Sequence, residues 1–332
     1  MISKNNRRID YLDFAKAISI LCMVWSHVGT KFEITDLYIH VFHMPIFFIL
    51  SGWCFNSNLD FKAFTRKKIA SLIRPYFIYG TFIYFLWNFI YSLLNMHDRK
   101  IPLKTFLQSI LYLNADISPY ACVQWFFTAL FFANIIFYFI VRICKKDKRL
   151  IMVFCIIIGI VGWILSSFGR YILPYRLPLS IDVAFMGTLF MGIGYILKEK
   201  ELRYFHALLF VPITIITVWL NSKSTYNMRI MNYGNPIFYL LASVSMSLTI
   251  ILFSKLFCLK IERKIIRGLL YVGRNSIWYL VFNQLFIRGI RLIAESVDIV
   301  IPNIVIILLV TVMMLPATVV GNKFLSWSIG RT

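Results

Sequence analysis

Three ionisable side chains, Asp13, Lys16 and His27, lie in a stretch that is otherwise apolar enough to cross a membrane, residues 13–29. A carboxylate or ammonium group costs roughly 2.5–3.5 kcal/mol in a bilayer even on a lenient insertion scale, so such groups usually serve a function. Lys16 and His27 are eleven residues apart, about three helical turns, which places both on one helix face. At ~1.5 Å per residue they lie roughly 16 Å apart along the axis, one near each end. This spacing favours a protein that acts on a ligand across the membrane.

A histidine near the end of such a helix is suited to proton transfer. Histidine has an unperturbed pKa of about 6.5, so the neutral His27 ring can take a proton from a hydroxyl group. Asp13 lies one helical turn from Lys16, and a simple ion pair between them is the alternative interpretation of both residues.

A second motif begins at His40 and continues through His43, Met44 and Pro45 towards Ser51-Gly52. Pro45 lacks a backbone donor, so it predicts either a kink or the true start of a helix. His43 stands beside this point at the depth of His27, and we predict that it assists or orients proton transfer there. His40 is predicted to be an interfacial histidine that tolerates replacement.

The elements that must position these residues are predicted to be transmembrane helices. Sixty per cent of the residues are apolar, the mean hydropathy is +0.76, and stretches long enough to cross ~30 Å of hydrocarbon recur. We predict an all-α polytopic membrane protein, a single domain over residues 1–332 with about ten transmembrane helices. The predicted spans are 13–29, 38–56, 76–95, 125–141, 150–168, 180–197, 204–220, 236–257, 275–294 and 299–320. Six cysteines without a CxxC pair or a His/Cys cluster predict neither a disulfide framework nor a metal site.

The formal charge of +21 is explained by membrane topology rather than by nucleic-acid binding. With the N-terminus inside, the predicted inner loops hold 24 Lys and Arg and the outer loops hold 10, as the positive-inside rule requires. This asymmetry predicts that both termini are cytoplasmic. It also leaves the inner basic runs open to a second interpretation, in which some of them bind a polyanionic ligand.

The motifs together resemble the acyltransferase-3 family. The pattern D-x-x-K-x10-H is followed by H-M-P-x-F-F-x-x-S-G, by R-P-Y from Arg74, by W-F-F from Trp125, and by G-x-N-S from Gly273. Within the family, the chain is most similar to the fucose 4-O-acetylase-like and enterobacterial common antigen O-acetyltransferase-like branch. Two positions depart from the pattern: many relatives carry Arg in place of Lys16, and many carry His in place of Asn283. Asn283 can form hydrogen bonds but cannot act as a base.

The resemblance implies a bacterial inner-membrane enzyme that moves acetyl from acetyl-CoA to a sugar hydroxyl of a capsule, an O-antigen or a lipid-linked precursor. Acetyl-CoA is then a co-substrate, no cofactor is bound permanently, and membrane lipids surround the protein. His27 is expected to be the general base or an acyl-accepting relay. Lys16 is expected to act on the donor and His43 to assist or orient, and Asp13 completes the expected catalytic set. The expected donor-binding residues are Arg66, Lys67, Lys68 and Arg74. The expected acceptor-binding residues are Trp125, Asn283 and Arg288.

Two other classes of function remain as alternatives. A secondary transporter or a flippase for lipid-linked oligosaccharides also needs intramembrane charges and ten or more spans, but the chain shows no inverted repeat. A sensor or structural membrane protein leaves the alignment of Lys16 with His27 unexplained.

Overall fold

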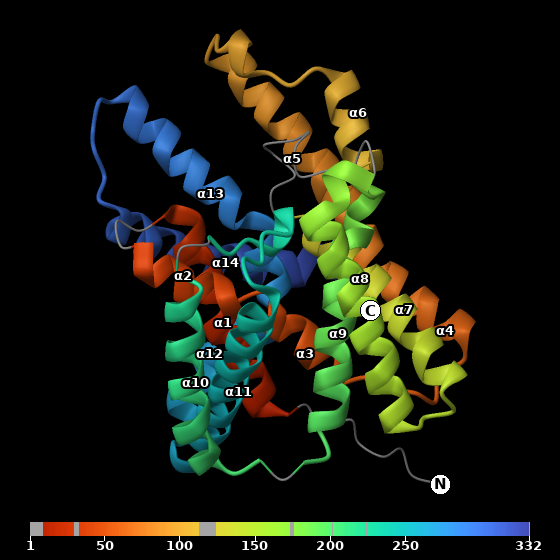
Figure 1. Cartoon of the computed structure of the whole chain (residues 1–332). Helices are drawn as coiled ribbons and strands as arrows, with labels where there is room; N and C mark the ends of the chain where they lie inside the picture. Colours follow the sequence, from red (N-terminus) through yellow and green to blue (C-terminus); the bar gives the residue numbers. More distant parts are fainter. Residues whose placement is uncertain are drawn as a thin grey trace, which may run out of the picture. The chain divides into compact units, whose positions relative to one another are not determined.

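The computed structural model describes residues 9–29, 33–112, 124–172, 176–200, 202–222 and 225–331. All the long elements in these ranges are helices, and the only β-type pairing described there is one isolated bridge between Asn227 and Asn232. The predicted all-α class is confirmed for this part of the chain (Figure 1).

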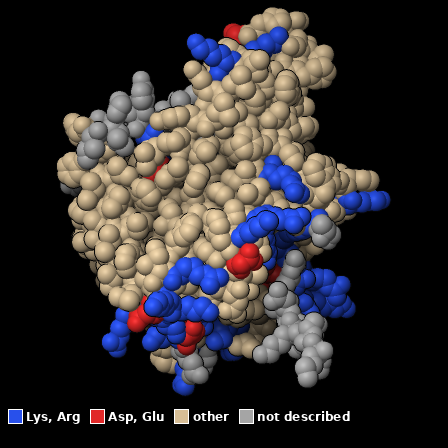
Figure 2. Space-filling view, turned by 90° about the vertical axis from the view of Figure 1, so that its right-hand side faces the viewer, with Lys and Arg blue, Asp and Glu red and all other residues tan. Residues whose placement is uncertain are grey.

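Within the described ranges, seven helical segments are long and apolar enough to cross a membrane. Many of their exposed side chains are apolar: Val153, Ile157 and Ile164 on α8 (Lys148–Ile172) are each at least 40% exposed, as expected for contact with lipid. On the face drawn in Figure 2, large areas carry no charged side chain. The chain is therefore an integral membrane protein. The seven segments are Phe61–Leu93, Trp125–Ile143, Lys148–Gly169, Pro178–Leu197, Pro236–Lys260, Ser276–Ser296 and Asn303–Phe324.

The other three predicted spans are helical but differ from a long apolar helix. Residues 13–29 belong to α1 (Asp10–Val28), which contains the charged residues described above. The prediction of one helix over 38–56 is wrong, because α2 (Glu33–Phe42) ends before a turn and α3 (Pro45–Trp53) begins at Pro45. Pro45 thus marks a helix start, where its missing N–H costs nothing. Residues 204–220 form α10 (Ala207–Leu220), which has 14 residues.

The described chain divides into two compact units, each built from segments that are far apart in the sequence. The first contains residues 1–47, 200–226 and 234–318, and the second contains residues 48–199, 227–233 and 319–332. Asp13, Lys16, His27 and His43 all belong to the first unit. The donor-binding prediction at 66–74 falls in the second.

In the first unit, α1 packs against α11 (Pro236–Lys260), α12 (Arg263–Arg274) and α13 (Ser276–Ser296). Phe14 on α1 forms a buried apolar cluster with Ile266 and Leu270 on α12. Gly273 lets the two helices approach closely, because a Cβ atom there would stand 1.7 Å from the Asp13 carbonyl oxygen. The same unit contains α14 (Asn303–Phe324) up to Thr318, and α10 packs on α11 (Figure 1).

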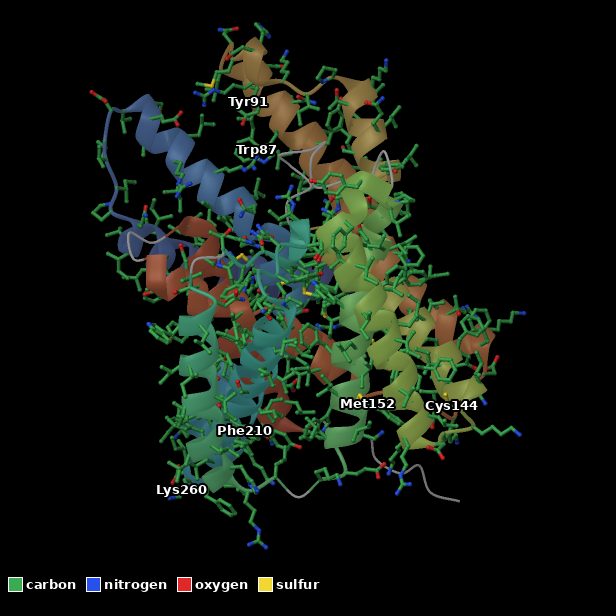
Figure 3. All side chains as sticks on the ribbon, viewed as in Figure 1. Trp87, Tyr91, Cys144, Met152, Phe210 and Lys260 are labelled. Carbon is green, nitrogen blue, oxygen red and sulfur yellow. The ribbon has the colours of Figure 1, made fainter. Side chains whose placement is uncertain are left out.

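In the second unit, α9 (Ile181–Leu197) packs between α7 (Trp125–Ile143) and α8. Gly52 allows the same kind of close approach, here to the Met191 backbone. The unit also contains α4 (Phe61–Lys68), a π-helical turn at Ile69–Ile73, α5 (Arg74–Leu93) and α6 (Leu103–Tyr112). Trp87 and Tyr91 stack one turn apart on α5, with ring centroids 5.5 Å apart (Figure 3).

Candidate functional site

The α1 helix is continuous from Asp10 to Val28, so Lys16 and His27 occupy the same face of one helix, as their spacing predicts. Lys16 Nζ lies 3.2 Å from Asp13 Oδ1, which confirms the ion pair of the alternative interpretation. The Lys16 side chain nevertheless remains 30% exposed, whereas that of Asp13 is 8% exposed. The ammonium group of Lys16 is therefore paired but still accessible.

A network of charges joins this end of α1 to α12. Arg274 Nε lies 3.2 Å from Asp13 Oδ2, and its Nη2 lies 2.8 Å from Asp10 Oδ1. Arg263 pairs with the other oxygen of Asp10 at 3.0 Å. No local spacing predicts that Arg274 lies beside Asp13, because the two residues are 261 positions apart. The carboxylate of Asp13 is thus shared between a neighbour on its own helix and an arginine from α12.

His27 is held by Asn283 of α13. Its Nδ1 lies 2.7 Å from the Asn283 side-chain oxygen. The Asn283 amide nitrogen donates to the carbonyl oxygens of Tyr279 and Leu280, at 2.7 and 2.9 Å, so the amide oxygen must face the histidine. An amide oxygen only accepts, and His27 Nδ1 is therefore the protonated ring nitrogen. The lone pair of the neutral ring is then on Nε2, the atom that can act as a base.

Asn283 forms hydrogen bonds with both ends of its side-chain amide. The residue is fully buried, and both ends of its amide are used, by His27 and by its own helix. The structure shows its contact with His27, and its role in binding the acceptor stays a prediction. An orienting partner that fixes the tautomer of a catalytic histidine is a recurrent arrangement in enzymes.

The end of α1 that carries His27 is fixed by two further side chains. Arg291 on α13 donates to the Val28 carbonyl oxygen, and Asn303 at the start of α14 donates to that of Gly29 at 2.9 Å. These carbonyls belong to the last turn of the helix, where no partner within the helix is available. The position of the His27 ring is thereby determined by three helices.

Two more histidines lie near this end of the first unit. His43 is buried, and its Nδ1 lies 2.7 Å from the Ile39 carbonyl oxygen. His40 makes an edge-to-face contact with His43, with ring centroids 5.2 Å apart. His40 Nε2 lies 3.1 Å from the hydroxyl of Ser26, the neighbour of His27. The prediction of a merely interfacial His40 is therefore corrected: the ring is part of the same polar cluster.

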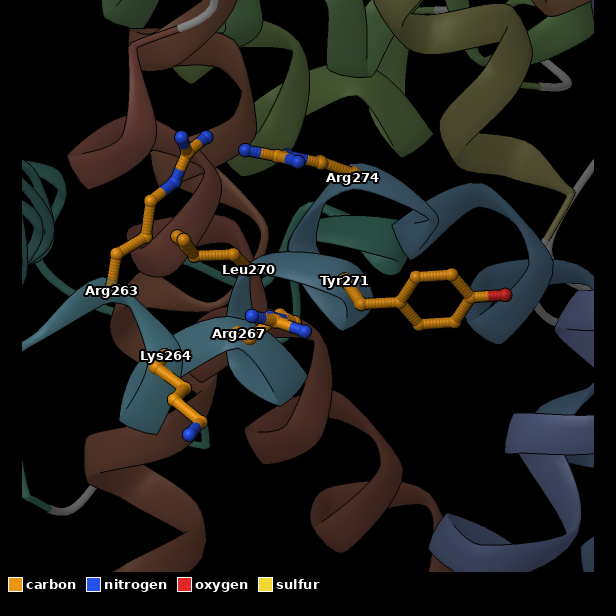
Figure 4. A pocket seen from close by; sticks show the side chains of 6 residues that line it. All are labelled: Arg263, Lys264, Arg267, Leu270, Tyr271 and Arg274. Carbon is orange, nitrogen blue, oxygen red and sulfur yellow. The ribbon is translucent and has the colours of Figure 1, made fainter.

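A pocket of about 320 Å³ lies along α12 in the first unit (Figure 4). Figure 4 shows the guanidinium groups of Arg263 and Arg274 pointing towards one another, and Lys264 pointing away from them. The lining residues recur every three or four positions, so they form one helix face beside the buried contact with α1. They are Arg263, Lys264, Arg267, Leu270, Tyr271 and Arg274. The positive-inside rule accounts for this basic run in the sequence, but its spacing of three or four residues also indicates a basic helix face.

The four predicted donor-binding residues all lie in the second unit, on α4 and at the start of α5. Arg66 and Lys67 are exposed on α4, and Lys68 lies over the Phe64 ring at 5.5 Å from its centroid. Arg74, at the start of α5, donates to the Trp327 carbonyl oxygen at 2.8 Å. The side chain of Arg74 thus holds the C-terminal segment.

The two remaining residues predicted to bind the acceptor belong to different units. Trp125 is buried at the start of α7 in the second unit, in edge-to-face contact with Phe126. Arg288 lies on α13 five residues beyond Asn283, which turns it to a different face of the helix. Of the predicted site residues, the structure therefore brings together Asp13 with Lys16, His27 with Asn283, and His43 with the His27 cluster.

Comparison with known proteins identifies the family. Residues 9–322 match the family model described as the acyltransferase domain, acyltransferase-3. The chain belongs to the acyltransferase-3 family. No curated protein and no solved structure matches the chain.

Membership in the acyltransferase-3 family, together with the seven apolar helices, indicates a membrane O-acyltransferase. Within the described ranges, no group of three or more His, Cys, Asp or Glu side chains could hold a metal ion.

Proposed function

We propose that this acyltransferase-3 protein transfers acetyl from cytoplasmic acetyl-CoA to a sugar hydroxyl of a surface polysaccharide or its lipid-linked precursor. The observation that carries the proposal is the hydrogen bond between His27 and Asn283, which leaves the lone pair of a neutral ring on Nε2. The second support is the charged cluster three turns away on the same helix, at Asp13 and Lys16. One helix thus connects a base with a site for an anionic donor.

In the proposed reaction, His27 Nε2 accepts the proton of the sugar hydroxyl as its oxygen attacks the thioester carbonyl carbon. The bond from this carbon to sulfur breaks, and the CoA thiolate leaves. The proton held by His27 then passes to the thiolate, directly or through water. The products are the acetyl ester and free CoA, and the histidine returns to its neutral form. His43 and Lys16 are placed to orient the reactants, and Lys16 also offers charge to the donor.

We further propose ten spans, with α1, the α2–α3 pair and α10 crossing in addition to the seven long helices. The bacterial cytoplasmic membrane is the proposed location, with both termini in the cytoplasm. The distribution of Lys and Arg supports this orientation.

The orientation predicts the side on which the loop after α7 lies. A cysteine placed by Lys146→Cys, in a chain that lacks Cys122 and Cys144, should react with a membrane-impermeant thiol reagent only after the cells are opened. Labelling of intact cells from outside would reverse the orientation and the sidedness of His27. The parent chain without the new cysteine gives the background.

Lys16 provides a prediction about the donor. Lys16→Ala should weaken binding of acetyl-CoA by about 3–10-fold, because one cationic contact is lost while Arg274 still neutralises Asp13. Lys16→Arg should retain activity, since it keeps the charge. The dissociation constant is measured by calorimetry on the purified protein in detergent. An unchanged constant in Lys16→Ala would limit Lys16 to its ion pair with Asp13.

The function itself is tested by mass spectrometry of the surface glycan from cells with and without the gene. The expected result is the loss of one acetyl group per repeat unit, restored by a plasmid copy. A glycan that reaches the surface fully acetylated without the gene would overturn the proposal. A lipid-linked precursor that accumulates inside would instead support the transporter.

A further inference from the structure

The α12 pocket has a charge imbalance that the ion pairs of the protein do not remove. Four cations line it, and the carboxylates of Asp10 and Asp13 pair with two of them, Arg263 and Arg274. The other two, Lys264 and Arg267, are exposed and have no hydrogen bond or ion pair with any residue in the described ranges. Two uncompensated positive charges therefore face this pocket.

The shape and chemistry of the lining favour a phosphate-bearing nucleotide. Arginine offers paired donors that match phosphate oxygens, and Lys264 adds a point charge. Tyr271 lies on the same helix face and provides an aromatic ring on which a base can stack. A volume of about 320 Å³ is at the lower end of the range for ligand pockets, about 300–1,000 Å³, so it suits one end of a long ligand.

The pocket also lies at the correct end of α1. Arg274 lines it and pairs with Asp13, which pairs in turn with Lys16. From Lys16, α1 leads towards His27, roughly 16 Å along the axis. A ligand anchored by its phosphates at α12 can therefore extend a narrow arm along α1 to the proposed base.

We infer that the α12 pocket binds the 3′-phospho-ADP moiety of the CoA donor, and that Arg267 and Lys264 are its main unshared contacts. The inference rests on the proposed function for the identity of the donor. It replaces the basic segment at 66–74 as the donor-binding surface. The phosphates of anionic lipids share the same chemistry, and the experiment separates the two sources.

The experiment measures binding of CoA, which needs no acetyl transfer, to the purified full chain in nanodiscs of phosphatidylcholine. Arg267→Gln should weaken binding of CoA by about 10-fold or more, and Lys264→Gln by less, because each loses one charged contact to phosphate. Dephospho-CoA should bind the wild type more weakly than CoA does. The Arg267→Gln substitution should reduce the affinity for dephospho-CoA less than the affinity for CoA. Lys260→Gln removes an exposed cation at the end of α11, outside the pocket lining, and serves as the matched control. Arg66→Gln alters the surface at 66–74, and it should leave the binding of CoA unchanged.

Wild-type affinity for CoA in an Arg267→Gln, Lys264→Gln double variant would overturn the inference, even if the protein acetylates glycan normally. The second arm of the experiment uses native mass spectrometry to measure how much phosphatidylglycerol the protein retains. If the double variant loses this lipid but still binds CoA with unchanged affinity, the pocket binds lipid. That result would also overturn the inference. Conversely, pocket-dependent CoA binding in a protein that acetylates no glycan would support the pocket and refute the proposed acceptor.

Discussion

Replacement of His27 by alanine should abolish detectable acetylation of the surface glycan at normal expression. A positioned general base typically contributes about 10²–10⁴ in rate, and His27 is held in place by Asn283 and by the capped end of α1. His27→Gln keeps polarity and approximate size but offers no base, so it should fail equally. The measurement is the acetyl content of the glycan by mass spectrometry, with protein levels checked by immunoblot.

Two other histidines provide the controls for this result. His206→Ala removes a half-buried ring just before α10, far along the chain from the His27 cluster, and should have no effect on acetylation. His40→Ala removes the hydrogen bond to Ser26 and the contact with His43, so we expect a loss smaller than that of His27 rather than none. Acetylation at the wild-type rate in His27→Gln would exclude His27 both as base and as relay, and the transporter would become the better explanation.

The second large effect is expected at Asn283, acting through His27. Asn283→Leu removes the acceptor of the Nδ1 proton, so the ring loses its preference for the tautomer with a lone pair on Nε2. We expect kcat to fall by about 10²-fold or more with little change in KM for acetyl-CoA, because the donor-binding residues lie at the other end of α1. The assay uses the purified protein with acetyl-CoA and a glycan acceptor.

The pH profile distinguishes this positioning role from simple destabilisation. Asn283→Asp places a carboxylate against the Nδ1 proton and favours the protonated ring. Loss of activity at acid pH should therefore begin at a higher pH than in the wild type, with activity recovered as the pH rises. A variant with uniformly lowered activity and an unshifted profile would limit Asn283 to packing. Asn283→Gln, which keeps the amide on a longer chain, should retain more activity than Asn283→Leu.

Local sequence was sufficient for the spans and for part of the site. In lipid, the backbone N–H and C=O groups of a long apolar run find hydrogen-bond partners within a helix. Seven segments of the described chain have the length and composition to cross a membrane in this way. The alignment of Lys16 with His27 follows from helical periodicity alone, as does the i, i+3 pair of Lys16 with Asp13. Pro45 indicated a boundary, although only the structure showed that the helix begins there rather than bending.

Contacts between helices depended on the tertiary structure, because no local spacing relates residues hundreds of positions apart. Asn283 was recognised as a departure at a family position, but its bond to His27 requires α13 to lie beside α1. Arg274 reaches Asp13 only because Gly273 lets α12 approach the α1 backbone. The sequence by itself determined where the long apolar helices form and which side chains share a helix face. The packing of those helices decided which groups orient the histidine and where uncompensated positive charge gathers.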